Sequence, residues 1–331
     1  MKVSELGEFG LIDLLAKMLP DSYNRQLIVG IGDDAAAWQS DDSIQLATTD
    51  SLFQDIHFSL DTINWQELGW KALAVNLSDI AAMGGTPTYA LVSLALPENT
   101  EVEGATALYR GMIELAQQFK VDIIGGDTCR APLVSITITV LGSTKSHGTQ
   151  ILTRSTAKSG EKIAVTGYIG SSAAGLNMLS NDLQLSPEAT AYLRNAFVHP
   201  QPQITEGLLL VEQGVKTCID ISDGLVADLH HICRASNAGA RVEIDRLPVH
   251  HLVKDNFREK AMEIALSGGE DYELLFTASD EVIEKVKSAA SCPVTVVGEI
   301  TTVMSGKVTL VDKKGKPFNL RKAGWDHFTA R

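Results

Sequence analysis

Cysteine is scarce in this chain, and its placement excludes two common uses. The four cysteines lie far apart and form no C-x-x-C pair: Cys129, Cys218, Cys233 and Cys292. Zinc ribbons and dithiol redox sites need closely spaced pairs, so we interpret these residues as scattered thiols of a reducing compartment.

The chain also lacks an excess of positive charge and a long apolar run. Its 28 basic and 41 acidic residues give a formal net charge of −13, which argues against a general binder of nucleic acids or anionic membranes. No apolar stretch approaches the roughly 18 residues that span a bilayer. The first residues, MKVSELGEFG, carry acids where a secretory signal needs basic and apolar segments. We therefore expect a cytoplasmic protein without nucleic-acid or membrane partners.

The familiar motifs of phosphate enzymes are missing as well. The sequence contains no G-x-x-x-x-G-K-[ST] phosphate loop, no G-x-G-x-x-G and no H-R-D or D-F-G kinase segments. It also contains no serine nucleophile elbow. If this chain acts on phosphates, its acidic residues must neutralise charge through bound metal ions.

What is present indicates two α/β domains. A length of 331 residues with 44% hydrophobic residues allows two domains of ordinary size. In the first half we predict strands at 43–50, 88–96, 121–124 and 133–142, and helices at 64–85 and 104–119. In the second half we predict strands near 162–166, 216–222 and 272–278, with helices after 172 and at 224–236. The polar stretch GSTKSHGTQ (142–150) is the best linker candidate, so we predict domains at 1–148 and 149–331.

One acid lies in an otherwise apolar helix. In NLSDIAAMGG (76–85), Asp79 is surrounded by Leu, Ile, Ala and Met, and the predicted helix is apolar nearly all round. A lone buried carboxylate costs several kcal/mol unless a cation offsets its charge. Either Asp79 has a cation as its partner, or the segment is not a buried helix.

Other acids recur where apolar strands end in glycine or small residues. A single such Asp is more often a turn or a helix cap than a ligand, and Asp223 could simply cap the next helix. Recurrence in both halves favours a binding crevice, because strand ends converge there in α/β proteins. Oxygen ligands in this number suit Mg²⁺. The recurrent acids are Asp33, Asp34, Asp50, Asp127, Asp220, Asp223, Glu270 and Asp271.

These segments together resemble the thiamine-monophosphate kinases, which belong to the superfamily of aminoimidazole ribonucleotide synthetase and selenophosphate synthetase. The resemblance covers almost the whole chain, in order: GIGDDAA, TTD followed seven residues later by His57, KALAVNLSDIAAMGG, IIGGDT, LTRS, DISDGL, SGGEDYELLF and GWDHF. Selenophosphate synthetases typically carry a reactive cysteine or selenocysteine near the N-terminus, and the first 128 residues here have none. The related hydrogenase-maturation proteins end in a functional cysteine, whereas this sequence ends in HFTAR.

The resemblance implies a fold and an assembly. The N-terminal domain would bind metal and ATP and would join its twin in a β-barrel across a homodimer axis. The C-terminal α/β domain would pack over it. The alternating strand at 133–142 suits the barrel.

The resemblance also implies a reaction and its site. ATP would phosphorylate thiamine monophosphate to thiamine diphosphate, the last step of thiamine diphosphate biosynthesis, with several Mg²⁺ ions and no covalent nucleophile on the protein. The implied metal ligands are Asp34, Thr48, Thr49, Asp50, Asp79, Asp127, Asp220 and Asp223. The implied ATP contacts are Gly126, Asp127, Arg154 and Ser222. The implied contacts of thiamine monophosphate are His57, Glu270 and Trp325.

Two alternatives stay open from the residues alone. One is a sibling ATP-dependent synthetase that forms a different activated phosphate. The other is an acidic Mg²⁺- or Ca²⁺-binding dimer without turnover. Product analysis with ATP and thiamine monophosphate separates all three.

Overall fold

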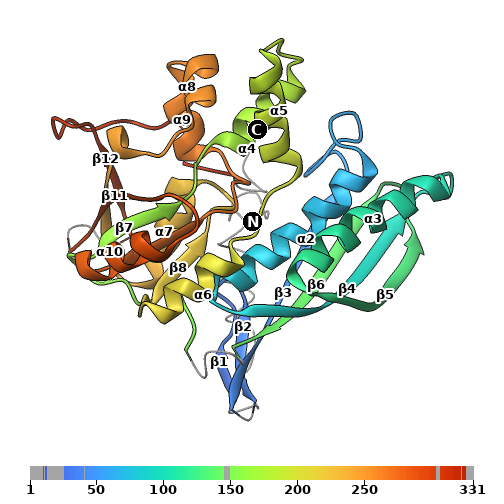
Figure 1. Cartoon of the computed structure of the whole chain (residues 1–331), viewed down its shortest axis with the longest axis horizontal. Helices are drawn as coiled ribbons and strands as arrows, with labels where there is room; N and C mark the ends of the chain where they lie inside the picture. The colour runs from blue at the N-terminus through green and yellow to red at the C-terminus, as the bar shows by residue number, and fades with distance from the viewer. Residues whose placement is uncertain are drawn as a thin grey trace.

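The structure, a computed structural model, contains two mixed sheets, each covered by helices (Figure 1). It describes residues 10, 12, 26–40, 42–144, 150–302, 306–321 and 323–325. The predicted domain boundary at 148 lies in 145–149, outside the described residues. Among the helices that are described, none is both long and apolar enough to cross a membrane.

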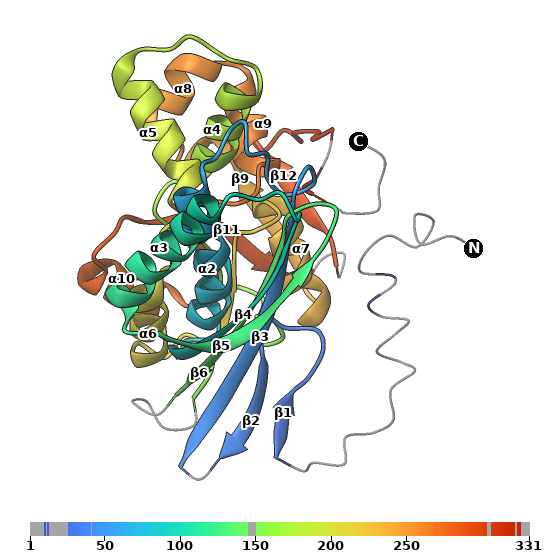
Figure 2. The ribbon, with the colours of Figure 1, turned by 90° about the vertical axis from the view of Figure 1, so that its right-hand side faces the viewer.

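The N-terminal sheet has six strands in the order β1-β2-β3-β6-β4-β5. Neighbours are antiparallel except for the parallel pair β4 and β5. Its helices α2 and α3 pack against each other and cover one face, as Figure 2 shows from the side. The bounds are β1 Leu27–Val29, β2 Ala36–Ser40, β3 Ser43–Phe53, α2 Trp65–Ala82, β4 Thr86–Leu96, α3 Val102–Phe119, β5 Asp122–Arg130 and β6 Ser135–Ser143.

Helix α2 is the buried helix that the sequence predicted. Asn64 and Glu67 form a capping box at its start, and Gly84 follows its end with φ +69°. Fifteen of its 18 residues are buried. The apolar residues on all sides of α2 are buried because the helix also packs against α5, α6 and β8 of the C-terminal half.

Strand β6 confirms the predicted alternation. Ile136, Ile138 and Val140 are buried against the helices, whereas Thr137 and Thr139 alternate with them on the less buried face. This pattern is what a sheet with one covered face requires.

The C-terminal sheet also has six strands, in the order β12-β9-β11-β7-β10-β8. Among its described strands, β9 and β12 are the one pair that runs parallel. The bounds are β7 Lys162–Thr166, α4 Ser171–Ser180, α5 Pro187–Val198, α6 Ile204–Glu212, β8 Thr217–Asp220, α7 Leu225–Ala235, β9 Gly239–Glu243, η1 Ile244–Arg246, α8 His251–Phe257, α9 Lys260–Ser267, β10 Leu274–Ala278, α10 Asp280–Ala289, β11 Val294–Thr301 and β12 Val308–Val311.

Close contacts join the two halves along α2. A Cβ on Gly207 of α6 would lie 2.2 Å from the carbonyl oxygen of Ala81, so only glycine permits this approach. The indole N–H of Trp70 donates to the carbonyl of Pro200 over 2.9 Å. One core cluster therefore contains residues of both halves.

Two strand predictions were wrong in their ends. β3 continues to Phe53, so Asp50 lies within it, and β5 runs on to Arg130 through Gly126 and Asp127. In both places ladder hydrogen bonds with a neighbouring strand extend the pairing beyond the apolar run. The predicted α/β architecture is confirmed, but the N-terminal sheet is open within the chain, with β1 and β5 at the ends of the described order. The intersubunit barrel stays a prediction.

Candidate active site

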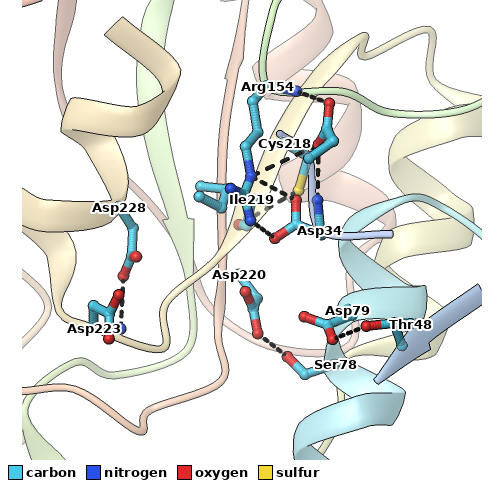
Figure 3. Close-up of polar contacts among 11 residues, drawn as sticks. Asp34, Thr48, Ser78, Asp79, Arg154, Cys218, Ile219, Asp220, Asp223 and Asp228 are labelled. Atoms are coloured by element: carbon cyan, nitrogen blue, oxygen red, sulfur yellow. Dashed lines mark hydrogen bonds and ion pairs between the residues drawn. The ribbon is translucent and has the colours of Figure 1, made fainter. Parts of the chain in front are cut away.

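Three carboxylates from distant parts of the chain converge between the two halves. Asp34 follows β1, Asp79 lies in the last turns of α2, and Asp220 ends β8. Each offers an oxygen, and these oxygens all lie within 4.8 Å of one another. Figure 3 shows the three side chains directed toward a common space. We refer to these three residues as the acidic cluster.

Hydroxyl groups and one guanidinium orient the acidic cluster. The hydroxyl of Thr48 donates to Asp79 over 2.6 Å, and the hydroxyl of Ser78 donates to Asp220 over 2.6 Å. Arg154 donates to both oxygens of Asp34, through Nη2 over 2.6 Å and through Nε over 3.2 Å. Such a fork fixes the carboxylate plane as well as its charge.

The positive charge near these acids is too small to stabilise all of them in the ionised form. Burial and the charges of Asp50, Asp220 and Asp34 raise the pKa of Asp79 well above its ordinary value. Burial and the charge of Asp34 raise the pKa of Asp220 to about 8. Burial and Asp34 raise the pKa of Asp33 to about 7. The single positive charge of Arg154 therefore does not balance the negative charges of these carboxylates.

The acidic cluster fits divalent metal ions. Its oxygens converge, the ionised forms require further positive charge, and carboxylate and hydroxyl oxygens are the ligands that Mg²⁺ takes. Asp50 lies beside the cluster on β3, and its backbone N–H donates to Asn76 of α2 over 3.0 Å. Burial also raises the pKa of Asp50.

A second group lies at the start of α7. Asp223, Asp228 and His231 each place one ligand atom within 4.8 Å of the others. The backbone N–H groups of Asp223 and Gly224 donate to Asp228 over 3.2 and 3.0 Å. The residue before α7 is Gly224, and no side chain caps it there, so the interpretation of Asp223 as a helix cap is wrong.

A cavity of about 540 Å³ opens on one side of the acidic cluster. Its walls come from the glycine-bearing turn before β2 and from the start of the C-terminal half. Thr48, Thr49 and Arg154 face it together with Asp34, and Arg234 of α7 adds a further cation.

A cavity of about 330 Å³ opens on the other side. His57, Glu270 and Trp325, the predicted contacts of thiamine monophosphate, all line it. Asp79 and Asp220 form its inner wall, and Ser222, Asp223 and Asp50 line it as well. The backbone N–H of Trp325 donates to the carbonyl of Asp223 over 3.1 Å, which ties the C-terminal segment to the site. The rest of the GWDHF segment, 326–328, lies outside the described residues.

Gly126 and Asp127 are not brought to the acidic cluster within this chain. Both are exposed on β5. Asp127 lies opposite Ser93, Ser93 opposite Thr137, and Thr137 opposite Ser51. Three strand spacings, roughly 14 Å, therefore separate Asp127 from the β3 residue next to Asp50.

Sequence reasoning missed two residues of this region and the structural task of a third. Lys71 and Ser78 are buried polar residues of α2, and their signal was the same as that of Asp79, a polar residue in an apolar helix. Asp271 has a structural task, because it accepts from the N–H groups of Gly170 and Ser172 at the start of α4 over 2.5 and 3.1 Å. Its neighbour Glu270 lines the cavity instead.

Two family models cover most of the chain. The AIR synthase related protein N-terminal domain matches residues 32–144, and the corresponding C-terminal domain matches residues 158–311. The thiamine-monophosphate kinase of Bacillus subtilis (strain 168) is 36% identical over 326 residues, which cover 96% of this chain and 98% of the relative. That of Escherichia coli (strain K12) is 38% identical over 328 residues, with 97% and 98% covered.

Solved structures show the same likeness. AaThiL complexed with AMPPCP and TMP is 31% identical, with a TM-score of 0.86 over 99% of both chains. Thiamine-monophosphate kinase from Stenotrophomonas maltophilia K279a is 34% identical, with a TM-score of 0.76 over 95% of this chain and 98% of that one.

Proposed function

The chain belongs to the AIR synthase related family, and we propose that it transfers the γ-phosphoryl group of ATP directly to thiamine monophosphate, with several Mg²⁺ ions between two cavities. It is an ATP-dependent thiamine-monophosphate kinase that forms thiamine diphosphate. The steps below concern how its own residues carry out that transfer.

The acidic cluster carries the proposal because it separates the two cavities. Asp34 faces the larger cavity, Asp79 and Asp220 face the smaller one, and their oxygens lie within 4.8 Å. Thr48 of the larger cavity is hydrogen-bonded to Asp79 of the smaller one. Phosphates that entered from the two sides would meet at these carboxylates, which is the arrangement that a phosphoryl transfer needs.

We assign the larger cavity to the phosphates of ATP. Arg154 offers a planar guanidinium at the inner end of this cavity, and Arg234 adds a second positive charge. Ser222 lies on the side of the acceptor, near the point of transfer. Gly126 and Asp127 would contact ATP from β5, and their exposure there fits a site that a second subunit completes.

We assign the smaller cavity to thiamine monophosphate. The acceptor combines an aromatic cation with a phosphate, and the cavity offers groups for each. Glu270 supplies negative charge and Trp325 an aromatic face for the cation, while His57 supplies a ring nitrogen for the phosphate.

The proposed ligands of the Mg²⁺ ions lie on both sides of the cluster. They are Asp34, Thr48, Thr49, Asp50, Asp79, Asp127, Asp220 and Asp223. When bound, the ions would neutralise the acids and the phosphates and withdraw charge from the transferring group. Without such charge, a terminal monoester with roughly −1.5 to −2 charge would be repelled from this region.

The protein itself contributes positioning and no covalent intermediate. Cys218 is a poor nucleophile, because burial and the charges of Asp34 and Asp220 raise its pKa well above the ordinary value. The acceptor phosphate is ionised at neutral pH and needs no general base of the kind that an alcohol requires. We therefore expect in-line transfer within a ternary complex.

The homodimer belongs to the same proposal. Residues 1–148 would form the metal- and ATP-binding dimerisation domain, and residues 149–331 the C-terminal domain. On β4, Tyr89 and Leu91 are 45% and 39% exposed and alternate with buried Ala90 and Val92. An apolar sheet face of this kind beside the exposed strand β5 supports pairing with a second copy.

Product analysis with ATP and thiamine monophosphate tests the function. We expect ADP and thiamine diphosphate in equal amounts, only with Mg²⁺ present. Another activated phosphate would favour a sibling synthetase, and no product would favour a metal-binding protein. Initial-rate plots at several fixed acceptor concentrations should intersect, and γ-labelled ATP without acceptor should leave no label on the denatured protein. Parallel plots together with stable labelling would refute direct transfer.

A further inference from the structure

A buried lysine lies directly behind the wall of the smaller cavity. Lys71 of α2 is 1% exposed, although an isolated ammonium group in the protein interior is very costly. Its Nζ lies 2.9 Å from Oε1 of Glu270 and 3.6 Å from the centre of the Phe197 ring. The lysine therefore has two partners, an anion and an aromatic face, and both come from the C-terminal half.

Glu270 is held by its backbone as well. It has φ +66°, in the left-handed region, and its N–H donates to the carbonyl of Ser222 over 2.8 Å. A Cβ on the preceding Gly269 would lie 2.2 Å from that same carbonyl oxygen, so glycine lets the loop approach. The Glu270 side chain keeps 27% exposure, on the cavity side.

We propose that Lys71 is a positioning residue for the acceptor: it holds the Glu270 carboxylate at the cavity wall, where that carboxylate receives the cationic part of thiamine monophosphate. This inference rests on the proposed function of the smaller cavity. It follows from the geometry because Lys71 does not line the cavity itself, so it can act on the acceptor only through Glu270.

Helix α2 gives this arrangement a second consequence. Lys71 and Asp79 are eight residues apart, about 12 Å along one rigid helix. The same helix therefore supports the carboxylate for the acceptor's cation and a carboxylate of the acidic cluster, where the acceptor's phosphate must lie. Lys71 thus helps to set the distance between the two ends of the acceptor site.

Four variants measure this role through both Michaelis constants. Lys71→Met keeps the length of the side chain and its packing on Phe197 but removes the charge. We expect it to raise the KM for thiamine monophosphate at least about tenfold, because Glu270 loses the partner that holds its carboxylate at the cavity wall, with the KM for ATP changed less than about twofold. Lys71→Arg should recover most of the affinity. In a Glu270→Gln background, Lys71→Met should change the KM for thiamine monophosphate less than about twofold, since its path to the acceptor is gone.

A matched control is a second ion pair that involves the same helix. Arg194 of α5 forms a forked ion pair with Glu67 of α2, which also joins the two halves but lies outside both cavities. Arg194→Met should lower the melting temperature and leave the KM for thiamine monophosphate unchanged. The inference would be overturned if Arg194→Met raised the KM for thiamine monophosphate as much as Lys71→Met does, or if Lys71→Met raised the KM values for both substrates equally. It would also be overturned if Lys71→Met raised the KM for thiamine monophosphate by the same factor in the wild-type and the Glu270→Gln backgrounds.

Calorimetric titration with thiamine monophosphate separates this inference from the proposed function. If the wild-type chain binds the compound but forms no thiamine diphosphate, the function fails, and the variants still decide the role of Lys71 through the dissociation constant. If Lys71→Met does not fold, the comparison of Glu270→Gln with Lys71→Met/Glu270→Gln decides it together with Lys71→Arg, since the double variant removes both charges of the pair.

Discussion

The backbone N–H of Phe53 donates a hydrogen bond to Nδ1 of His57 over 3.0 Å. Because Nδ1 is the acceptor, the neutral ring carries its proton on Nε2. In this tautomer the Nε2–H group of His57 can donate a hydrogen bond into the smaller cavity. The ring could take up a proton at Nδ1 only if the hydrogen bond from Phe53 broke. This supports a role in holding the acceptor phosphate over a role as a base.

His57→Gln should therefore retain more activity than His57→Ala. The amide of Gln places a donor near the position of Nε2, so we expect its KM for thiamine monophosphate to rise only a few-fold, against about tenfold or more for Ala. Steady-state kinetics with both substrates checks this. A general base would instead show a kcat loss of about 10²- to 10⁴-fold in both variants, which would contradict the donor role.

Asp79→Asn should nearly abolish turnover without unfolding the protein. The substitution removes a charge from the acidic cluster, where burial and neighbouring acids already disfavour the ionised form. We expect the metal-free variant to melt no lower than the wild type and to lose most of the Mg²⁺-dependent rise in melting temperature. Asp122→Asn, an exposed residue at the start of β5, is the control and should change neither quantity. Activity near the wild-type level at low Mg²⁺ would exclude Asp79 as a ligand.

The metal-free protein should become less stable as the pH rises from 4 to 8. Burial raises the pKa of Asp33 to about 7 and that of Asp220 to about 8, whereas an unfolded chain releases these protons near pH 4. In this window the native state therefore holds more protons than the unfolded state, and each extra proton lowers the free energy of unfolding by about 1.4 kcal/mol per pH unit.

Mg²⁺ should reverse that trend, since it competes with these protons. Urea unfolding at pH 6 and pH 8, with EDTA and with Mg²⁺, should show the larger metal stabilisation at pH 8. Calorimetry in two buffers of different ionisation enthalpy should show proton release on Mg²⁺ binding. Equal stabilisation at both pH values would mean that the acidic cluster is not the metal site.

Trp325→Ala should raise the KM for thiamine monophosphate far more than the KM for ATP. The reason is that Trp325 lines only the acceptor cavity, where its ring can face the aromatic cation. Trp38→Ala on β2, outside both cavities, is the matched control and should change neither constant. If Trp325→Ala affects both substrates equally, the residue packs the C-terminal segment and does not bind the acceptor.

The sequence by itself determined the elements and the kind of chemistry. The length of the apolar pattern predicted α2, and the alternation in 133–142 predicted a half-buried strand, because these periodicities are set by local backbone geometry. Asp79 in an apolar helix predicted a cation partner from its charge alone. Lys71 carried the same signal eight residues earlier, with the opposite sign.

Only the tertiary structure decided which of these residues meet. Asp79 and Asp220 come together because α2 packs against β8, and Asp34 reaches them because it precedes β2, which pairs with β3, and α2 packs against β3 as well. No local pattern encodes such contacts. Glu270 and Asp271 are adjacent, but the left-handed backbone at Glu270 directs their side chains to different places. Glu270 lines the smaller cavity, whereas Asp271 accepts hydrogen bonds from the start of α4. Asp127 shares its sequence pattern with the other acids but lies three strands from Ser51, because strand order depends on which edges pair, and pairing is a long-range choice that neighbouring residues cannot specify.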